Sequence, residues 1–305
     1  MKLIYQGVDI YPEVSINSCI HEIYAEKRSD TLKIRFNDTK GLWNKWNPMQ
    51  GDVIEVVEGP ARTGKMFVTS IKPENGLYTL RAMSMPLSGE VVKNRSWEAV
   101  RFLQLGEQIA QEHGLTFKSY GVTDQVYPYL SQNSQTDFEF LQTRCMLEGC
   151  ALVIYDGNLI IYDELYLESQ PPAGEIYVGP DGVFEYQDNS AMSYGSAEVE
   201  SGGFKGKFTA EGNTSRILRP REPLKVTSDA EATRYAKALL RIANKYSYTG
   251  WIEDNLQLKY AAASVVRITT ERQDLWNGPV FITHIRHDYV ARKSKIFFRK
   301  PLEGY

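Results

Sequence analysis

The sequence predicts a β-dominated α+β protein, in which two antiparallel β-barrel or sandwich modules flank a small α+β domain. Three observations predict this fold class. Short runs of alternating apolar and polar residues, separated by glycine and asparagine turns, fill both ends of the chain. Two of these β regions repeat the same order of strands and turns. Between them lie two capped helical patterns and one hairpin pattern.

Residues 1–88 are predicted to form the first β module. Its Asn75-Gly76 pair, between two alternating runs, is a strong hairpin signal. The loop over residues 37–50 carries Trp43 and Trp46, and exposed tryptophan is a common anchor of protein interfaces. We therefore name Trp43 and Trp46 as candidate interface residues, with packing beneath the module as an equal alternative.

Residues 89–168 are predicted to form the α+β domain, with two helices and a hairpin. The first helix is expected to open at Ser96 and to end at Gly114, since glycine suits the left-handed helix end. Thr136-Asp137-Phe138-Glu139 is a capping box for the second helix. Two apolar runs over residues 151–155 and 158–162, separated by Asp156-Gly157, predict the hairpin.

Residues 169–305 are predicted to form the second β module, including a helix over about residues 228–246. Ser228-Asp229-Ala230-Glu231 is a second capping box, and the alanine-rich helix after it suits close packing against a sheet. The Gly-rich basic stretch 202–221, which contains Gly212-Asn213, is interpreted as a mobile solvated loop. Contact with a nucleic-acid backbone is the alternative. The basic residues are Lys205, Lys207, Arg216, Arg219 and Arg221.

The two β regions share a segment of nine residues. Residues 64–72 and 278–286 have Gly, Phe, Thr and Ile at the same positions, and three further pairs are conservative. An apolar strand precedes each segment, and a turn with a last strand follows it. Because order and residues agree together, we interpret the two regions as copies of one module.

The composition is that of a folded protein with many aromatic residues. The 305 residues include 35 Lys and Arg and 38 Asp and Glu, giving a net charge of -3. This balance argues against a protein that mainly neutralises phosphates. Aromatic residues make up 12%, which is typical of β-rich structure and of large protein interfaces.

No targeting or membrane segment is expected. The sequence has no apolar run of about 18 residues, so we expect no membrane span. Residues 1–7 lack the apolar part of a secretory signal, so we expect a chain made in the cytoplasm without a signal peptide. Cys19, Cys145 and Cys150 are an odd number and fit buried free thiols.

No motif predicts catalysis. Residues 59–66 nearly spell a phosphate-binding loop, but Met66 stands where Ser or Thr must hold magnesium, so a hairpin turn is predicted. His284 and His287 lie in a strand pattern, where odd spacing sends side chains to opposite faces and argues against a shared metal. We therefore expect no enzyme activity, no cofactor and no metal.

Three segments follow one another in a fixed order. Residues 48–56 (PMQGDVIEV) enter the first β region, residues 129–141 (YLSQNSQTDFEFL) lead into a helix, and residues 228–232 open the last helix. Together they resemble the late control gene D protein family, the baseplate hub proteins of contractile phage tails, tailocins and related contractile injection systems. Residues 261–264 depart from the family's Gly-rich strand entry, and from the short length we expect no appended spike or lysozyme domain.

The resemblance implies a structural baseplate hub with two tube-like β domains per subunit. A homotrimer would present six quasi-equivalent modules, which join the hexameric tail tube to the threefold central spike. The implied partners are the tail tube protein, the central spike protein and baseplate wedge proteins, with the tape measure protein as a further candidate. DNA is implied only as passing cargo, and no membrane is implied. The chain would be made in a bacterium and assembled into the baseplate of the particle.

Two alternatives stay open. The first is a hub or spike base of a type VI or extracellular injection system, which is the same class of role. The second is a peptidoglycan- or carbohydrate-binding tail-associated protein, or a hydrolase, that uses aromatic side chains as sugar platforms. Trp43, Trp46 and the Tyr-rich stretch over residues 120–130 support the second alternative.

Overall fold

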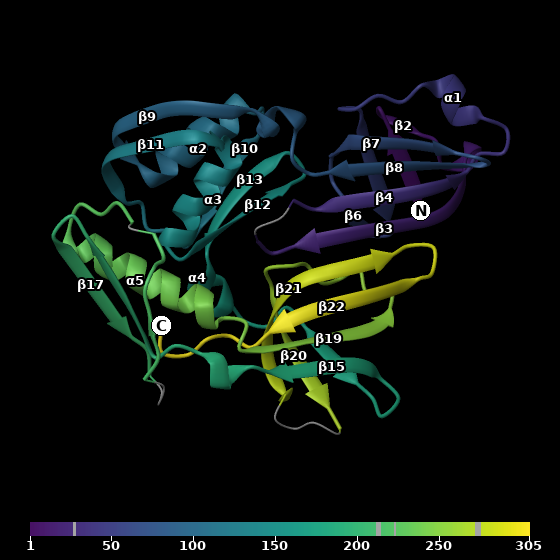
Figure 1. Ribbon diagram of the computed structural model, residues 1–305. Helices are drawn as coiled ribbons and strands as arrows, with labels where there is room; N and C mark the ends of the chain where they lie inside the picture. Colours follow the sequence, from purple (N-terminus) through teal and green to yellow (C-terminus); the bar gives the residue numbers. More distant parts are fainter. Residues whose placement is uncertain (27–28, 212–214, 223, 272–275) are drawn as a thin grey trace.

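The protein has a β-dominated α+β fold, as the sequence predicts (Figure 1). The computed structural model describes residues 1–26, 29–211, 215–222, 224–271 and 276–305. Among these residues, no helix is long and apolar enough to cross a membrane.

The first β module is a sheet of six main strands in the order β3-β4-β8-β7-β5-β1. Alternating residues of these strands point inward and form its core, which is why the apolar alternation was visible in the sequence. Its strands are β1 (Lys2–Tyr5), β3 (Ser15–Tyr24), β4 (Thr31–Asn37), β5 (Val53–Glu58), β7 (Met66–Glu74) and β8 (Leu77–Met83). Its shorter elements are β2 (Val8–Asp9), η1 (Tyr11–Glu13), α1 (Leu42–Trp46) and β6 (Ala61–Arg62).

The second β module repeats this arrangement with the order β15-β19-β22-β21-β20-β14. Taken in chain order, the six strands of the two modules occupy the same six places in their sheets. One pair differs, because β14 runs parallel to β20 whereas β1 runs antiparallel to β5. The strands are β14 (Glu175–Val178), β15 (Val183–Asp188), β19 (Tyr248–Asn255), β20 (Val265–Thr270), β21 (Gly278–Asp288) and β22 (Lys293–Arg299).

Strand register confirms the predicted repeat. Phe67 of β7 pairs with Val53, and its counterpart Phe281 of β21 pairs with Val265. Further along, the pairing of β7 with β8 skips the residue between Val68 and Ser70, and the pairing of β21 with β22 skips the residue between Ile282 and His284. Each skipped residue is the threonine shared by the two segments, so even the β-bulge is repeated.

The α+β domain lies between the modules in the chain. It contains the two predicted helices and the hairpin, together with a two-stranded ribbon and a parallel strand. The predicted hairpin is confirmed, with one further residue at each outer end, and so is the reciprocal capping box at Thr136 and Glu139. Its elements are η2 (Leu87–Glu90), β9 (Val92–Arg101), α2 (Phe102–Glu112), β10 (Thr116–Tyr120), β11 (Val126–Thr136), α3 (Asp137–Leu147), β12 (Cys150–Tyr155), β13 (Asn158–Asp163) and α4 (Glu164–Glu168).

The predicted helix start at Ser96 is wrong. Residues 92–101 instead form β9, in which Ser96 pairs with Ser131 of β11, and α2 begins only at Phe102. The long ladder between β9 and β11 and the stacking of Trp97 on Phe140 outweigh the local helix signal.

A separate layer is inserted between β15 and β19. It consists of η3 (Ser190–Met192), β16 (Ser196–Ser201), β17 (Phe204–Thr209), β18 (Ile217–Leu218) and α5 (Asp229–Asn244). α5 packs on β16 and β17 with a core of its own, so it does not cover the second module directly. The packing is close, because a Cβ atom on Gly206 would lie 2.1 Å from the backbone of Ala232.

The two remaining predictions for this layer hold only in part. Ser228 Oγ accepts from the Glu231 amide, but the Glu231 carboxylate accepts from Thr227 and not from Ser228, so the capping box is incomplete. The Gly-rich basic stretch is not one loop, since β17 and β18 lie within it, and Gly212-Asn213 lie outside the described residues. Lys205, Lys207 and Arg219 form ion pairs with glutamates of β16.

Candidate functional site

The two predicted interface tryptophans have different surroundings. The Trp43 side chain is 1% exposed and packs among Phe36, Tyr78 and Tyr5 in the core of the first module. Trp46, at the end of α1, is 38% exposed and touches Trp43 edge to face. Trp43 therefore has almost no surface to offer a partner, whereas Trp46 does.

The two modules meet in a strand-to-strand joint. The second half of β21 pairs antiparallel with β3, so the modules share one continuous sheet (Figure 1). His284 stacks on Tyr24 with ring centroids 4.4 Å apart, and the Glu22 carboxylate hydrogen-bonds to His284 and forms an ion pair with Arg286. These side chains lie on one face of the joint, and His287 lies on the other, as the odd spacing predicts.

The other face of the joint holds a buried histidine pair. His21 and His287 face each other across β3 and β21, and Tyr289 stacks on His21. Burial lowers the pKa of His287 to about 4, and burial with the neighbouring histidine lowers the pKa of His21 to about 3. Both imidazoles are therefore neutral at physiological pH, which keeps an uncharged core across the joint.

The joint also includes loops. Tyr289 belongs to the core of the first module, although it follows β21 of the second. Leu256 and Leu258, in the loop between β19 and β20, pack against the same core. An ion pair between Arg292 and Glu58 lies beside these contacts.

The α+β domain and the insertion are fastened to the joint by buried charges. Glu164 lies within 2.6 Å of Lys245 and within 3.4 Å of Arg299, and all three are nearly inaccessible to solvent. Lys245 also binds Glu26, near the end of β3, at 2.5 Å. Such a cluster requires every member, because a lone buried charge is costly. The modules, the α+β domain and the insertion are therefore fixed to one another.

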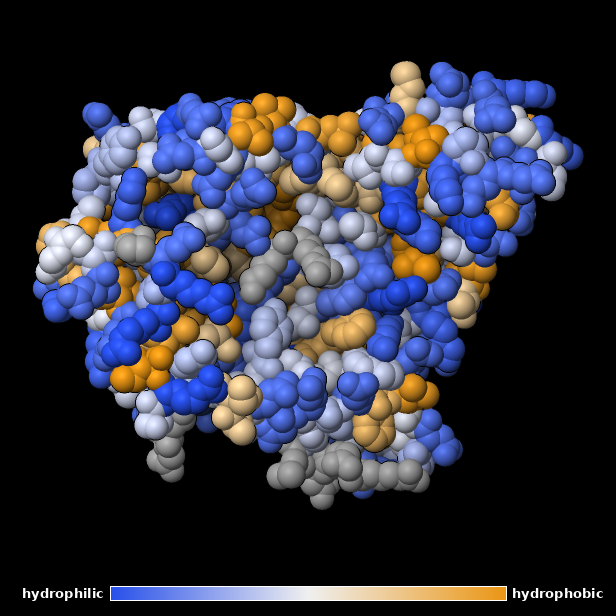
Figure 2. Space-filling model, in the orientation of Figure 1, coloured by the Kyte–Doolittle hydropathy of each residue, from blue (hydrophilic) through white to orange (hydrophobic). Residues whose placement is uncertain are grey.

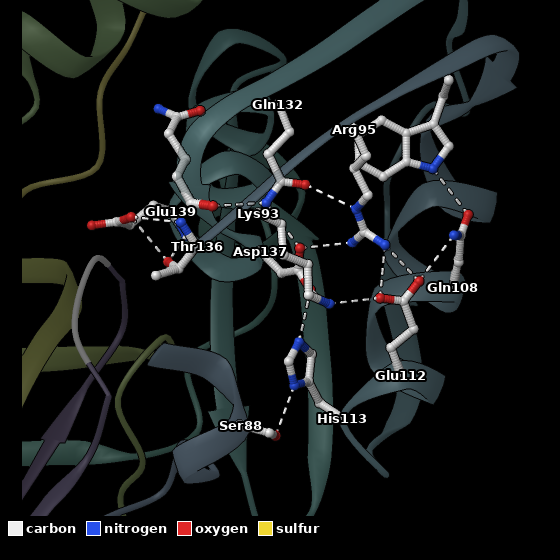
Figure 3. Close-up of polar contacts among 12 residues, drawn as sticks. Ser88, Lys93, Arg95, Gln108, Glu112, His113, Gln132, Thr136, Asp137 and Glu139 are labelled. Carbon is white, nitrogen blue, oxygen red and sulfur yellow. Dashed lines mark hydrogen bonds and ion pairs between the residues drawn. The ribbon is translucent and has the colours of Figure 1, made fainter. Parts of the chain in front are cut away.

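A second polar cluster lies inside the α+β domain, at the start of α3 (Figure 3). The Asp137 carboxylate binds Lys93 at 2.6 Å, Arg95 at 2.7 Å and His113 at 2.9 Å, and His113 binds Ser88 at 2.8 Å. Burial alone would raise the pKa of Asp137, but its hydrogen bonds and the charge of Arg95 lower that pKa to about 2.

Hydrogen bonds thus connect Ser88, His113 and Asp137 in the order of a serine–histidine–aspartate triad. No sequence motif predicted this arrangement. Ser88 lies 25 positions before His113, and His113 lies 24 positions before Asp137. No local sequence motif spans such separations, so only the tertiary contacts reveal the arrangement. Two cations already neutralise Asp137, whereas the aspartate of a triad must stabilise a histidine cation. The cluster is suited to tying β9, α2 and α3 together.

A cavity of about 590 Å³ opens where the two modules meet the α+β domain. Its lining contains six tyrosines contributed by all three parts: Tyr24, Tyr120, Tyr155, Tyr162, Tyr260 and Tyr289. The P-loop-like turn forms one wall through Pro60, Ala61 and Arg62, and strands precede and follow that turn, as predicted.

No protein-family model matches the sequence, and no curated protein sequence matches it. The fold, however, is that of phage tail proteins. The chain superposes on the 43 kDa tail protein of prophage MuSo2 from Shewanella oneidensis with a TM-score of 0.77 and 13% identity, covering 98% of both chains. A tail protein from Neisseria meningitidis gives 0.76 with 11% identity, over 98% of this chain and 95% of that one.

A third similar structure comes from another kind of machine. An Escherichia coli component of the type VI secretion system, described as structurally similar to the bacteriophage T4 tail proteins gp27 and gp5, gives a TM-score of 0.63 with 12% identity. The superposition covers 100% of this chain and 78% of that one. These superpositions establish a shared fold over nearly the whole chain, and the low sequence identities limit the conclusion to the fold.

Proposed function

We propose that this protein is a baseplate hub of a contractile tail or injection particle and belongs to the late control gene D group. The observation that carries the proposal is the duplicated module. Two copies of one six-stranded sheet, joined by the pairing of β3 with the second half of β21, give each chain two similar surfaces. Three chains then supply six similar surfaces, which suits a partner with sixfold symmetry above and one with threefold symmetry below.

The hub proposal assigns a role to each part. The two modules meet the tail tube protein, and the trimer rests on a separate central spike protein. The α+β domain lies beside the modules and would meet wedge proteins, with its polar clusters serving stability and not catalysis (Figure 1).

The test is binding to the tail tube protein encoded beside this gene. A purified tube protein should bind this chain and form a complex with six tube subunits to three hub subunits, measured by light scattering coupled to size exclusion. Absence of binding, with both proteins folded, would argue against the hub.

A carbohydrate-binding tail protein or hydrolase is the second candidate. The tyrosine-lined cavity and the Ser88–His113–Asp137 series are the observations that favour it. Fragments of peptidoglycan should then bind with a change in tyrosine fluorescence, and Ser88→Ala should abolish any hydrolysis. The hub proposal expects neither binding nor turnover.

A further inference from the structure

The second half of β21 pairs with β3 at the joint between the two modules, but the equivalent half of β7 in the first module has no such strand partner among the described residues. In the second module, the first half of β21 pairs with β20 and its second half pairs with β3. In the first module, the first half of β7 pairs with β5 through Met66 and Phe67. On that same side, residues 70–74 have no strand partner among the described residues.

Residues of β7 are more exposed than their counterparts on β21, because no strand covers this edge of β7 in the described chain. Ile285 and His287 of β21 are 0% and 3% exposed, because β3 and Tyr289 cover them. Their counterparts on β7 are Ile71, which is half-buried, and Pro73, which is exposed. The same sheet position is thus closed in one module and open in the other.

The strand that would close it lies at the far end of the molecule. β15 is the outermost strand of the second module and takes the place that β3 has in the first. Its outer edge pairs with no other described strand. β7 and β15 lie at opposite ends of the two stacked modules (Figure 1), so one chain cannot join them to each other. A second copy of the chain can.

The register of the missing pair follows from the repeat. Ile34 lies between Leu80 and Cys19 in the first module, and Ile252 lies between Ile296 and Phe184 in the second. Phe184 of β15 therefore corresponds to Cys19 of β3. Counting along the strands then makes His21 equivalent to Tyr186, and Glu22 equivalent to Gln187.

We infer that β7 of one copy pairs antiparallel with β15 of the next copy in the register of the internal joint. Arg286 pairs with Glu22 inside the chain, so Lys72 would pair with Gln187 between chains. Pro73 would likewise face Tyr186, although it has no backbone N–H to donate across this pair. This inference rests on the proposed function, since it supplies the contact that closes three subunits into a ring of six modules.

The charges of the two edges act in both directions. Lys72 would lie diagonally across from Glu185, within reach of an ion pair, whereas Glu74, the counterpart of Asp288, would lie directly opposite Glu185. Exposed Trp46 and Met49 belong to the loop between β4 and β5, the counterpart of the loop that carries Leu256 and Leu258 across the internal joint. Figure 2 shows a mainly hydrophilic face with separate apolar groups.

Disulfide trapping tests the register. The Lys72→Cys and Gln187→Cys variant should form a covalent trimer on mild oxidation, seen on a non-reducing gel, whereas either single substitution should not. Glu22→Cys with Arg286→Cys, the same pair inside the chain, is the matched control and should close within one chain. The three native thiols are buried and should not contribute.

A charge exchange tests the same contact without a new bond. Lys72→Glu should shift trimer formation to at least about tenfold higher concentration by light scattering, because it meets Glu185, and adding Glu185→Lys should restore assembly. Lys33→Glu, an exposed lysine on β4, should change nothing.

Two results would overturn the inference. One is a trimer that neither crosslinks at this pair nor responds to Lys72→Glu, which leaves the hub proposal intact. The other is a wild-type chain that stays monomeric at every attainable concentration. In that case tube binding, measured separately, decides whether the hub proposal survives.

Discussion

The two β modules have the same strand order and the same bulge, yet they differ in how much of each sheet is covered by other parts of the chain. The second module is covered on two sides, by β3 and by the α+β domain. The first module leaves residues 70–74 of β7 without a strand partner in the described chain. Equivalent residues of the two modules are therefore expected to contribute differently to the free energy of unfolding, and substitutions at equivalent positions can measure that difference.

The largest difference is expected at the shared phenylalanine. Phe281 is buried against Tyr162 and Ala151 of the α+β domain, whereas Phe67 is only half-buried. Phe281→Ala should cost about 3–5 kcal/mol of the free energy of unfolding, and Phe67→Ala about half as much or less. Urea unfolding followed by tyrosine and tryptophan fluorescence measures both. Equal costs would contradict the packing of the α+β domain on this strand.

The tryptophans of the first module should differ almost as much. Trp43→Ala removes the centre of an aromatic core and should cost about 3–5 kcal/mol. Trp46→Ala should cost less than about 1 kcal/mol in the free chain, because the ring is partly exposed. Thermal melts of the two variants should show a large loss of stability for Trp43→Ala and a small one for Trp46→Ala, which distinguishes a core ring from a surface ring. A marked loss of stability in Trp46→Ala would show that this ring also serves the core.

The shared isoleucine should show a smaller difference that depends on assembly. Ile285→Ala should cost about 2–4 kcal/mol, and Ile71→Ala about 1 kcal/mol in the free chain. If β7 pairs with a second copy, Ile71 becomes buried and its cost rises in the trimer. Unfolding at low and high protein concentration would reveal this rise. A concentration-independent cost would weaken the proposed pairing.

Acid should weaken the internal joint in particular. The folded pKa values of His21 and His287 lie near 3 and 4, below their usual 6.5, so the unfolded chain binds protons that the folded chain does not. Stability from these groups is present above pH 6.5 and falls as the pH drops toward 4, by about 1.4 kcal/mol per pH unit for each histidine.

The proposed joint between chains has Pro73 and Tyr186 at the equivalent places and lacks this sensitivity. His21→Gln with His287→Gln should flatten the dependence of the urea midpoint on pH. An unchanged slope in that variant would place the titrating groups elsewhere.

The sequence by itself determined the module repeat, because alternation and turn residues are local signals that need no tertiary information. The capping box at Thr136 and the hairpin of the α+β domain were local in the same way. The start of α2 was not, since a ladder with a strand about 35 residues away overrode the helix signal at Ser96.

Only the tertiary structure decided which side chains the repeats bring together. The histidine pair joins positions 21 and 287, and the buried charges join residues 26, 164 and 245. Trp43 and Trp46 look alike in the chain, and folding alone separates a core ring from an exposed one. Periodicity specifies which face of a strand is apolar, but the partner that covers that face is chosen by packing over distances that no local pattern encodes.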